Sequence, residues 1–518
     1  MEQQETAKKD SFWLPLFVVV IAAFAAILNN SSINVALPKM MAIFGVSAED
    51  AQWILTAYML TSGIVIPVTG YLGDRLGTKR VYLICTAIFT LGSVLCSLAW
   101  NNSSMVAARV VQGIGGGAMM PISMAIVYRI VPREKIGLAL GFWGMAAVCG
   151  PAIGPTLGGY IVDNLNWRFL FTMNIPVGVT GLFLTHLLIP EGPLRKNLKF
   201  DYWGFIFSTV GCFALLLALS EGTNKGWSSY YIVSLFTFSF FTLLLFIIVE
   251  LNQEQPMLDL RLFKSRVFSI SVFAGSLITV GLYGGVFLIP LFTQNLLSMT
   301  PYETGLLLMP AAIVTALMMP ISGFLFDKFG AKLLAATGLI LLAWGTFEFH
   351  NLSLDTSNQS IILFAIIRSL GMGLAMMPIT TAGMNTIPLN LVGRASSLNN
   401  VTRQIAGSFG IAVLTAVMQN RQAFHAARLS EAVSATSPAA TSLLAQLQGL
   451  LAHTGAGIAS KGAALGILSG LIAQSSMVWA IDDTFVVAAL FIFIAIPLSF
   501  FLNKPAKEVD LPGTSTNA

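Results

Sequence analysis

Hydrophobic and polar positions alternate along this chain in long blocks. Apolar runs of about 20 residues, the length at which an α-helix crosses a bilayer, recur from end to end between shorter polar segments. We therefore expect an all-α integral membrane protein with 14 transmembrane helices, an even number that leaves both termini on one side of the membrane. The predicted spans are residues 13–36, 51–72, 81–100, 104–128, 137–161, 168–190, 202–220, 230–250, 267–293, 304–325, 332–350, 360–386, 397–419 and 482–502.

The segment from about 420 to 481 is the part of the chain where this pattern allows two interpretations. It is rich in Ala, Ser and Leu, and residues 462–481 are apolar enough to form a span of their own. An amphipathic or surface helical loop outside the membrane is favoured, because an added span would move Lys504 and Lys507 away from the other basic segments. A membrane-embedded segment stays open as the alternative.

The composition excludes an ordinary water-soluble protein. Hydrophobic residues make up 56% of the chain and charged residues 10%, whereas soluble domains carry about 25% charged residues. The net charge of +5 does not indicate nucleic-acid binding, because most Lys and Arg gather in alternate interspan segments when Met1 is placed in the cytoplasm. This bias predicts that both termini are cytoplasmic. The four cysteines show no metal-ligand spacing and are expected to be small core residues.

Two motifs occur twice in the chain. GYLGDRLGTK (residues 70–79) returns as GFLFDKFGAK (323–332), and RVVQGIGGGAMMP (109–121) returns as RSLGMGLAMMP (368–378). A parallel duplication of this kind builds several transporter folds. The distance between the copies leaves room for two extra spans between two six-helix bundles. The expected organisation is a tail at 1–12, a six-helix bundle at 13–190, an extra helix pair with its loops at 191–266, a second six-helix bundle at 267–502 and a tail at 503–518.

Polar residues at membrane depth are the first candidates for function. An unpaired Arg109 within span four would be costly, so it must face a cavity, a carboxylate or backbone carbonyls, and Arg368 holds the matching place in the second half. In span one, the stretch AILNNSSINVALP (26–38) places Asn29, Asn30 and Ser31 side by side. These side chains either line a cavity or only hydrogen-bond between helices.

Glycine patterns mark the close approaches of helices. Gly70, Asp74 and Gly77 lie at a tight turn between two spans, with Arg75 among the basic residues there. In span five, CGPAIGPTLGG sets three glycines four residues apart, so that another helix can approach one face. The two prolines beside them each remove a backbone donor and bend the helix.

These motifs resemble those of a known family. The chain resembles a major facilitator superfamily transporter and, within it, the fourteen-span drug:proton antiporters of the EmrB/QacA type. GYLGDRLGTKR is similar to the superfamily's signature between spans two and three, RVVQGIGGGA to its span-four signature, and GPAIGPTLGG to the span-five signature of antiporters. The resemblance covers nearly the whole chain.

The resemblance implies alternating access, in which two bundles rock about a central cavity and export an amphipathic compound while protons enter. No cofactor is expected, since the proton gradient supplies the energy. The loop motif implies a lock on the outward-facing state, Arg109 a role in proton transfer, and the span-five motif a seal against leak. The conformational residues implied are Gly70, Asp74, Arg75, Gly77, Asp327 and Gly330 in the two loop motifs, and Gly150, Pro151, Gly154, Pro155, Gly158 and Gly159 in span five.

One residue departs from the family pattern. Asn29 stands where such antiporters commonly carry an aspartate, and an amide cannot bind and release a proton at physiological pH. Glu221 and Glu348 are the substitute candidates, with Arg109, for proton coupling. The candidates for lining the substrate cavity are Asn29, Asn30, Ser31, Asn34, Tyr58, Gln112, Trp143, Phe287 and Gln294.

The prediction is therefore a secondary transporter of the cytoplasmic membrane and not an enzyme. A phosphate-binding GxxxxGK[ST] loop is absent from the sequence, which argues against an ATP-driven exporter. An exporter of an endogenous metabolite, lipid or siderophore stays open, as does an uncoupled facilitator, because Asn29 replaces the usual acid. Expected partners are a small amphipathic substrate, protons and the lipid bilayer, with no nucleic acid. In a cell with an outer membrane, a periplasmic adaptor is a candidate partner.

Overall fold

The computed structural model describes residues 12–192, 194, 198–433, 438–453 and 460–502. The predicted N-terminal tail up to residue 11 and the C-terminal tail 503–518 lie outside these residues. Across the described ranges the secondary structure is helical and contains no strand. The helices of the first half are α2 (Trp13–Phe44), α3 (Ala48–Leu76), α4 (Thr78–Ser97), α5 (Asn102–Ile130), α6 (Ile136–Asn164), α7 (Phe169–Thr172) and α8 (Asn174–Leu188).

The remaining helices lie between Tyr202 and Ser499. They are α9 (Tyr202–Lys225), α10 (Tyr230–Asn252), α11 (Arg266–Tyr283), α12 (Ile289–Asn295), α13 (Pro301–Phe329), α14 (Ala331–Phe347), α15 (Asn358–Met384), α16 (Val392–Ala432), α17 (Pro438–His453) and α18 (Ser460–Ser499), with short turns η1 (Arg133–Lys135), η2 (Leu260–Lys264), η3 (Gly284–Leu288) and η4 (Glu348–Asn351). Within the described ranges, 13 helical segments are long and apolar enough to cross a membrane, and α6, bent by 43°, makes a fourteenth. The predicted architecture is confirmed.

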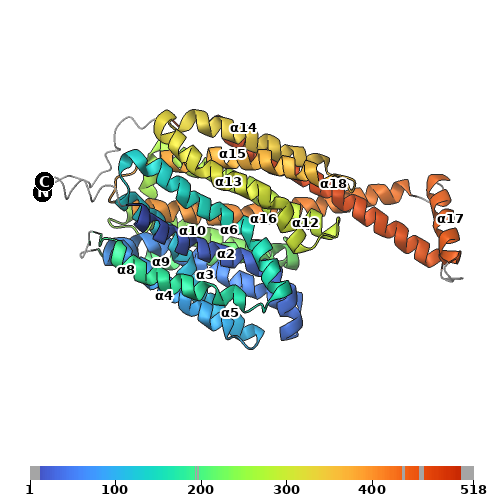
Figure 1. The fold of residues 1–518 in the computed structure, drawn as a ribbon, viewed down its shortest axis with the longest axis horizontal. Coiled ribbons are helices and arrows are strands. Elements are labelled where there is room, and N and C mark those ends of the chain that lie inside the picture. The colour runs from blue at the N-terminus through green and yellow to red at the C-terminus, as the bar shows by residue number, and fades with distance from the viewer. Residues whose placement is uncertain (1–11, 193, 195–197, 434–437, 454–459, 503–518) are drawn as a thin grey trace.

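The helices form two bundles and an extra pair. Helices α2 to α8 pack on one another, and so do α11 to α16 with α18 (Figure 1). The bundles meet along α6 with α13 and along α3 with α16. The pair α9 and α10 covers one seam, because α9 contacts both α3 and α16. We call the face where α2 begins and α18 ends the proximal face, and the opposite one the distal face (Figure 1).

Local sequence explains where the helices begin and end. Asn101 and Ser104 form a reciprocal cap at the start of α5, as do Thr300 and Glu303 at the start of α13. The interspan turns of the two loop motifs reverse the chain at glycines with positive φ, +91° at Gly77 and +79° at Gly330. A side chain there would be strained, so the same residue type ends both copies.

The segment from 420 to 481 differs from the prediction. Helix α16 continues for 41 residues to Ala432, and α18 begins at Ser460 and runs for 40 residues into the last span. Together with α17 they project beyond the distal face as a helical arm (Figure 1). Residues 462–481 are therefore neither a separate span nor a separate surface helix. They are the first half of α18, which hydropathy cannot distinguish from a span because the apolar pattern is continuous.

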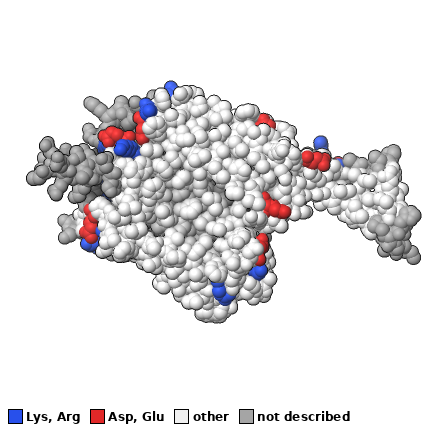
Figure 2. Space-filling model, viewed as in Figure 1, with Lys and Arg blue, Asp and Glu red and all other residues white. Residues whose placement is uncertain are grey.

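Charge and apolar surface are distributed as a bilayer requires. Lys, Arg, Asp and Glu gather toward the two ends of the visible face, and the surface between them is nearly free of charge (Figure 2). Among the 13 unbroken spans of the described ranges, α10 has the smallest buried share, 22% of its apolar window. Its exposed apolar side chains include Phe238, Phe240, Phe241, Leu244 and Ile248.

Candidate functional site

Arg109 is the centre of a buried polar cluster in the first bundle. Its side chain is 0% exposed, and its Nη1 donates to Asn29 Oδ1 at 3.2 Å and to Gln112 Oε1 at 2.7 Å. Its Nη2 donates to Asn30 Oδ1 at 3.1 Å, and its Nε donates to a backbone carbonyl of α3 at 3.0 Å. The guanidinium carbon lies 4.1 Å from the centre of the Tyr58 ring. Arg109 has no carboxylate partner among the described residues, so neutral acceptors and an aromatic face stabilise its charge.

A second layer of hydrogen bonds orients the amides around Arg109. Asn29 Nδ2 donates to the carbonyl of Leu170 at 3.0 Å, and Gln112 Nε2 donates to Ser93 Oγ at 2.8 Å. Each amide nitrogen is thereby engaged elsewhere, which leaves its oxygen to face the guanidinium. The four predicted residues Asn29, Asn30, Tyr58 and Gln112 thus meet at Arg109.

The other predicted cavity residues lie elsewhere. Ser31 donates from Oγ to the carbonyl of Pro151 at 3.1 Å and so joins α2 to α6. Trp143 is buried and donates from Nε1 to Ser123 Oγ at 2.8 Å. Asn34 is exposed, whereas Phe287 in η3 and Gln294 in α12 are half-buried in the second bundle. Their predicted role in cargo binding stays a prediction.

The second bundle carries two arginines at membrane depth. Arg368 donates from Nη2 to the carbonyl of Leu282 at 2.8 Å, next to the π-helical turn η3. Its Nε is buried without a partner. Arg403, on α16, was missed by the sequence analysis, although its place within span thirteen could have revealed it. It has a sulfur of Met376 3.9 Å from Nη2 and no ion pair within the described part of the chain.

The two glutamates predicted as proton carriers lie away from the Arg109 cluster. Glu221 is buried near the distal end of α9, close to Lys225, which pairs with Glu49 of α3. Glu348 begins η4 at the distal end of span eleven, and its Oε1 accepts a hydrogen bond from Trp344 Nε1 at 2.6 Å. Proton coupling through either residue stays a prediction.

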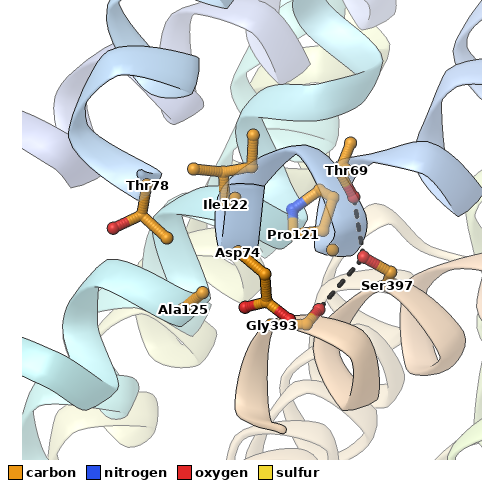
Figure 3. A pocket seen from close by; sticks show the side chains of 10 residues that line it. Thr69, Asp74, Thr78, Pro121, Ile122, Ala125, Gly393 and Ser397 are labelled. Atoms are coloured by element: carbon orange, nitrogen blue, oxygen red, sulfur yellow. Dashed lines mark hydrogen bonds between the residues drawn. The ribbon is translucent and has the colours of Figure 1, made fainter. Parts of the chain in front are cut away.

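A contact between the two bundles closes the proximal face. Asp74 on α3 accepts from Arg394 Nε of α16 at 3.3 Å, and Arg129 Nη2 lies 4.0 Å from the same carboxylate. Beside this ion pair, the hydroxyls of Thr69 and Ser397 lie 2.7 Å apart (Figure 3). The crevice that these residues line is too narrow for a substrate, so it is a seam between bundles.

Glycine permits this approach of the helices. A Cβ atom on Gly70 would lie 2.9 Å from the Cα of Arg394, closer than packed atoms approach. Arg75 in the same motif donates to Tyr71 Oη of its own helix at 2.7 Å. The motif therefore supplies both the charge and the space that the contact with α16 needs.

The second copy of the loop motif makes the reciprocal contact. Asp327 at the end of α13 accepts from the backbone N–H groups of Gly137 and Leu138, each at 3.1 Å. These groups lie at the start of α6, where the helix dipole favours a carboxylate. A Cβ atom on Gly323 would clash with the carbonyl of Gly137. Each motif aspartate thus binds the opposite bundle.

The span-five glycines pack α6 between two helices. Cβ atoms on Gly154 and Gly158 would clash with Ser31 and Ser32 of α2, and one on Gly150 with Ile27. Gly159 faces the other way, and a Cβ atom added there would lie 3.4 Å from the backbone nitrogen of Tyr302 on α13. The bend of α6 falls between Pro151 and Ile153, and Pro155 follows one turn later. The role of these residues in sealing the interface stays a prediction.

Comparisons with known proteins agree with the fold. A family model described as Major Facilitator Superfamily matches residues 19–411. The MFS-type transporter YhcA of Bacillus subtilis is 36% identical over 95% of this chain and 93% of its own length. The multidrug export protein EmrB of Escherichia coli is 28% identical over 98% of both chains. A crystal structure of the human organic anion transporter MFSD10 has a TM-score of 0.61 at 13% identity and covers 93% of this chain and 98% of that one.

Proposed function

Because the chain belongs to the Major Facilitator Superfamily, we propose that it exports amphipathic compounds by alternating access, driven by proton antiport. The proximal face is then the cytoplasmic one, as the basic interspan segments indicate. The membrane is the cytoplasmic membrane of a bacterium, since the bacterial proteins YhcA and EmrB are similar over nearly the full length. EmrB is named for multidrug export, which supports drugs as cargo.

The observation that carries this proposal is the reciprocal contact of the two loop motifs. Asp74 binds Arg394 of the second bundle, and Asp327 binds the start of α6 in the first. Both contacts lie at the proximal face and join elements that must separate for cargo to enter from that side. A charge pair and a helix-dipole contact can break and reform without unfolding either bundle.

The charges at membrane depth favour anionic or neutral cargo over cations. Amide oxygens stabilise the charge of Arg109 without neutralising it, and Arg368 and Arg403 have no carboxylate partner among the described residues. An anionic head group could supply the missing partner, while a cation would be repelled. The same arginines support the second candidate function, a dedicated exporter of an endogenous anionic lipid or metabolite.

Transport into reconstituted vesicles tests the proposal. A fluorescent fatty-acid analogue and a cationic dye would be compared, each with and without an imposed pH gradient, against protein-free vesicles. Accumulation of the anionic probe that follows the gradient is the expected result. Equilibration that ignores the gradient would identify an uncoupled facilitator, and preference for the cationic dye would contradict the cargo class. Movement of neither probe would favour a dedicated cargo.

A further inference from the structure

Two carboxylates are buried together where the extra helix pair meets the proximal face. Asp201 precedes α9 and is 3% exposed, and Glu250 in the last turn of α10 is 1% exposed. Neither forms an ion pair with a described residue. Sequence analysis passed over both, because carboxylates at the ends of spans are usually solvated.

Each carboxylate has one oxygen engaged and one oxygen free. Asp201 Oδ1 accepts from the N–H of Gly204 at 2.9 Å, and Glu250 Oε1 accepts from the N–H of Leu258 at 3.0 Å. The second oxygens, Asp201 Oδ2 and Glu250 Oε2, are buried without a hydrogen-bond partner. The two groups converge on Gly204, where an added Cβ atom would clash with Asp201 Oδ2 and lie 3.0 Å from Glu250 Oε1.

Two adjacent buried anions with unsatisfied oxygens are unstable unless something neutralises one of them. The described residues contain no group of three or more His, Cys, Asp or Glu placed to hold a metal ion. A proton meets the need, because a protonated carboxyl donates a hydrogen bond to its ionised neighbour, as in carboxylate dyads that share one proton. We propose that Asp201 and Glu250 form a proton-binding site that controls the contact between Asp74 and Arg394.

Arg394 links this pair to the closed proximal face. The charged groups that act on Glu250 are Asp201, Asp259 and Arg394. Asp259 accepts from the N–H of Arg261, whose own side chain binds backbone carbonyls at the end of α10. Arg394 is the cation among these groups, and it is the residue that pairs with Asp74 across the bundle interface.

Loss of the shared proton adds one negative charge on the Glu250 side of Arg394. The guanidinium is then drawn toward the dyad, and its bond to Asp74 weakens. When the proton binds, the dyad attracts Arg394 less strongly, and Arg394 stays paired with Asp74. Helix α9 contacts both α3 and α16, so the extra pair is placed to act on both sides of the contact. The assignment of this proton to cytoplasmic pH rests on the proposed function, which orients the proximal face.

Distance measurements across the proximal face test this site directly. Spin labels would be placed on Leu76→Cys at the end of α3 and Leu389→Cys before α16, both exposed positions, and the four native cysteines are buried. In the purified full chain we expect a single short distance between the labels at acidic pH. As pH rises, a second, longer distance should appear, and the fraction of molecules that show it should increase. Glu250→Gln, whose amide can donate as the shared proton does, is expected to lose this shift and keep the short distance throughout. Glu254→Gln, which removes an exposed carboxylate just beyond the end of α10, is the matched control and should keep the shift.

Infrared difference spectroscopy of the same samples measures the protonation of the carboxyl groups directly. A protonated carboxyl band is expected in the wild type and should be lost in Glu250→Gln. If Glu250→Gln does not fold, Asp201→Asn serves in its place, since Asn also caps a helix. A Glu250→Gln variant that tracks pH like the wild type, or a wild-type shift driven by sodium at fixed pH, would overturn the proposal. Failure of vesicle transport would contradict the proposed function without changing these distances.

Discussion

Arg109 and Arg368 begin the two copies of the same motif, but the two halves stabilise them differently. Arg109 has three amide oxygens, a carbonyl and an aromatic face around it. Arg368 has one carbonyl, and its Nε has no partner. In the second half, η3 replaces regular helix beside the arginine, and the bound carbonyl of Leu282 lies just before it.

The two halves thus carry an arginine at matching positions of the duplicated motif, and they differ in the groups that surround it. The first half surrounds its arginine with three amide oxygens, a carbonyl and a tyrosine ring, so the charge is held in one position. The second half leaves hydrogen-bonding capacity unused at a break in regular helix, where backbone rearrangement is easiest. We therefore expect the side chains around Arg109 to stay fixed during transport and the backbone around Arg368 to change conformation.

Replacing Arg109 should have the largest effect. Arg109→Met leaves the oxygens of Asn29, Asn30 and Gln112 buried without their donor, which should lower the free energy of unfolding by about 3 kcal/mol or more. Export should be lost as well. Thermal unfolding in detergent and vesicle transport measure the two effects. Arg109→Lys is the control, and wild-type stability in Arg109→Met would contradict the clustered arrangement.

Placing an acid at Asn29, the position where the resemblance implies an aspartate, should change cargo preference. In Asn29→Asp, a carboxylate would lie where Oδ1 now accepts from Arg109 at 3.2 Å, and it would neutralise that charge when ionised. We expect the ratio of cationic to anionic probe transport to rise by about tenfold, the equivalent of about 1.4 kcal/mol. Asn29→Ala removes the oxygen without adding charge, so an equal change in that variant would show that charge is not the cause.

Replacing Arg368 should have a smaller effect on stability than replacing Arg109. Arg368→Met removes one hydrogen bond to a carbonyl and also an unsatisfied donor, so the two changes partly offset each other. We expect a loss of about 1 kcal/mol in the free energy of unfolding, with a reduced export rate. A stability loss as large as that of Arg109→Met would remove the contrast between the halves.

Glu348→Gln should have the smallest effect. Glu348 lies at the distal end, bonded to the exposed Trp344 of its own helix. Export and its dependence on the pH gradient should stay within about twofold of the wild type, because substitutions of half-buried side chains at a helix end, away from the core, shift free energies by about 0.5 kcal/mol. Loss of gradient dependence in this variant would instead identify Glu348 as the proton carrier.

Much of the fold could be predicted because a bilayer imposes a length and a composition on every span. The repeated glycines also predicted structure well, since Gly77 and Gly330 both adopt positive φ at the turns that their motifs indicated. Hydropathy did not predict the structure of the segment beyond the distal face, where a bilayer does not limit the length of a helix. Nothing in the apolar pattern marks the point at which α16 or α18 leaves the membrane.

The candidate site was only partly predictable. Depth alone showed that Arg109 needs partners, but which of the allowed partners it has depends on how α2, α3 and α5 face one another. The pair Asp201 and Glu250 is separated by a whole helical hairpin in sequence, and each residue alone is typical of a span end. Their meeting at Gly204 follows from the packing of α9 on α10, which no local pattern encodes.

The helical arm has a mechanical consequence. At 1.5 Å per residue, the 41 residues of α16 extend for about 60 Å, about twice the thickness of the hydrocarbon core. Such a helix, if it tilts, pivots about a point within the membrane. A tilt of α16 by about 10° would displace its far end by about 5 Å relative to the membrane surface. Movements of the second bundle that are hard to detect within the bilayer are thus enlarged in the aqueous space beyond it.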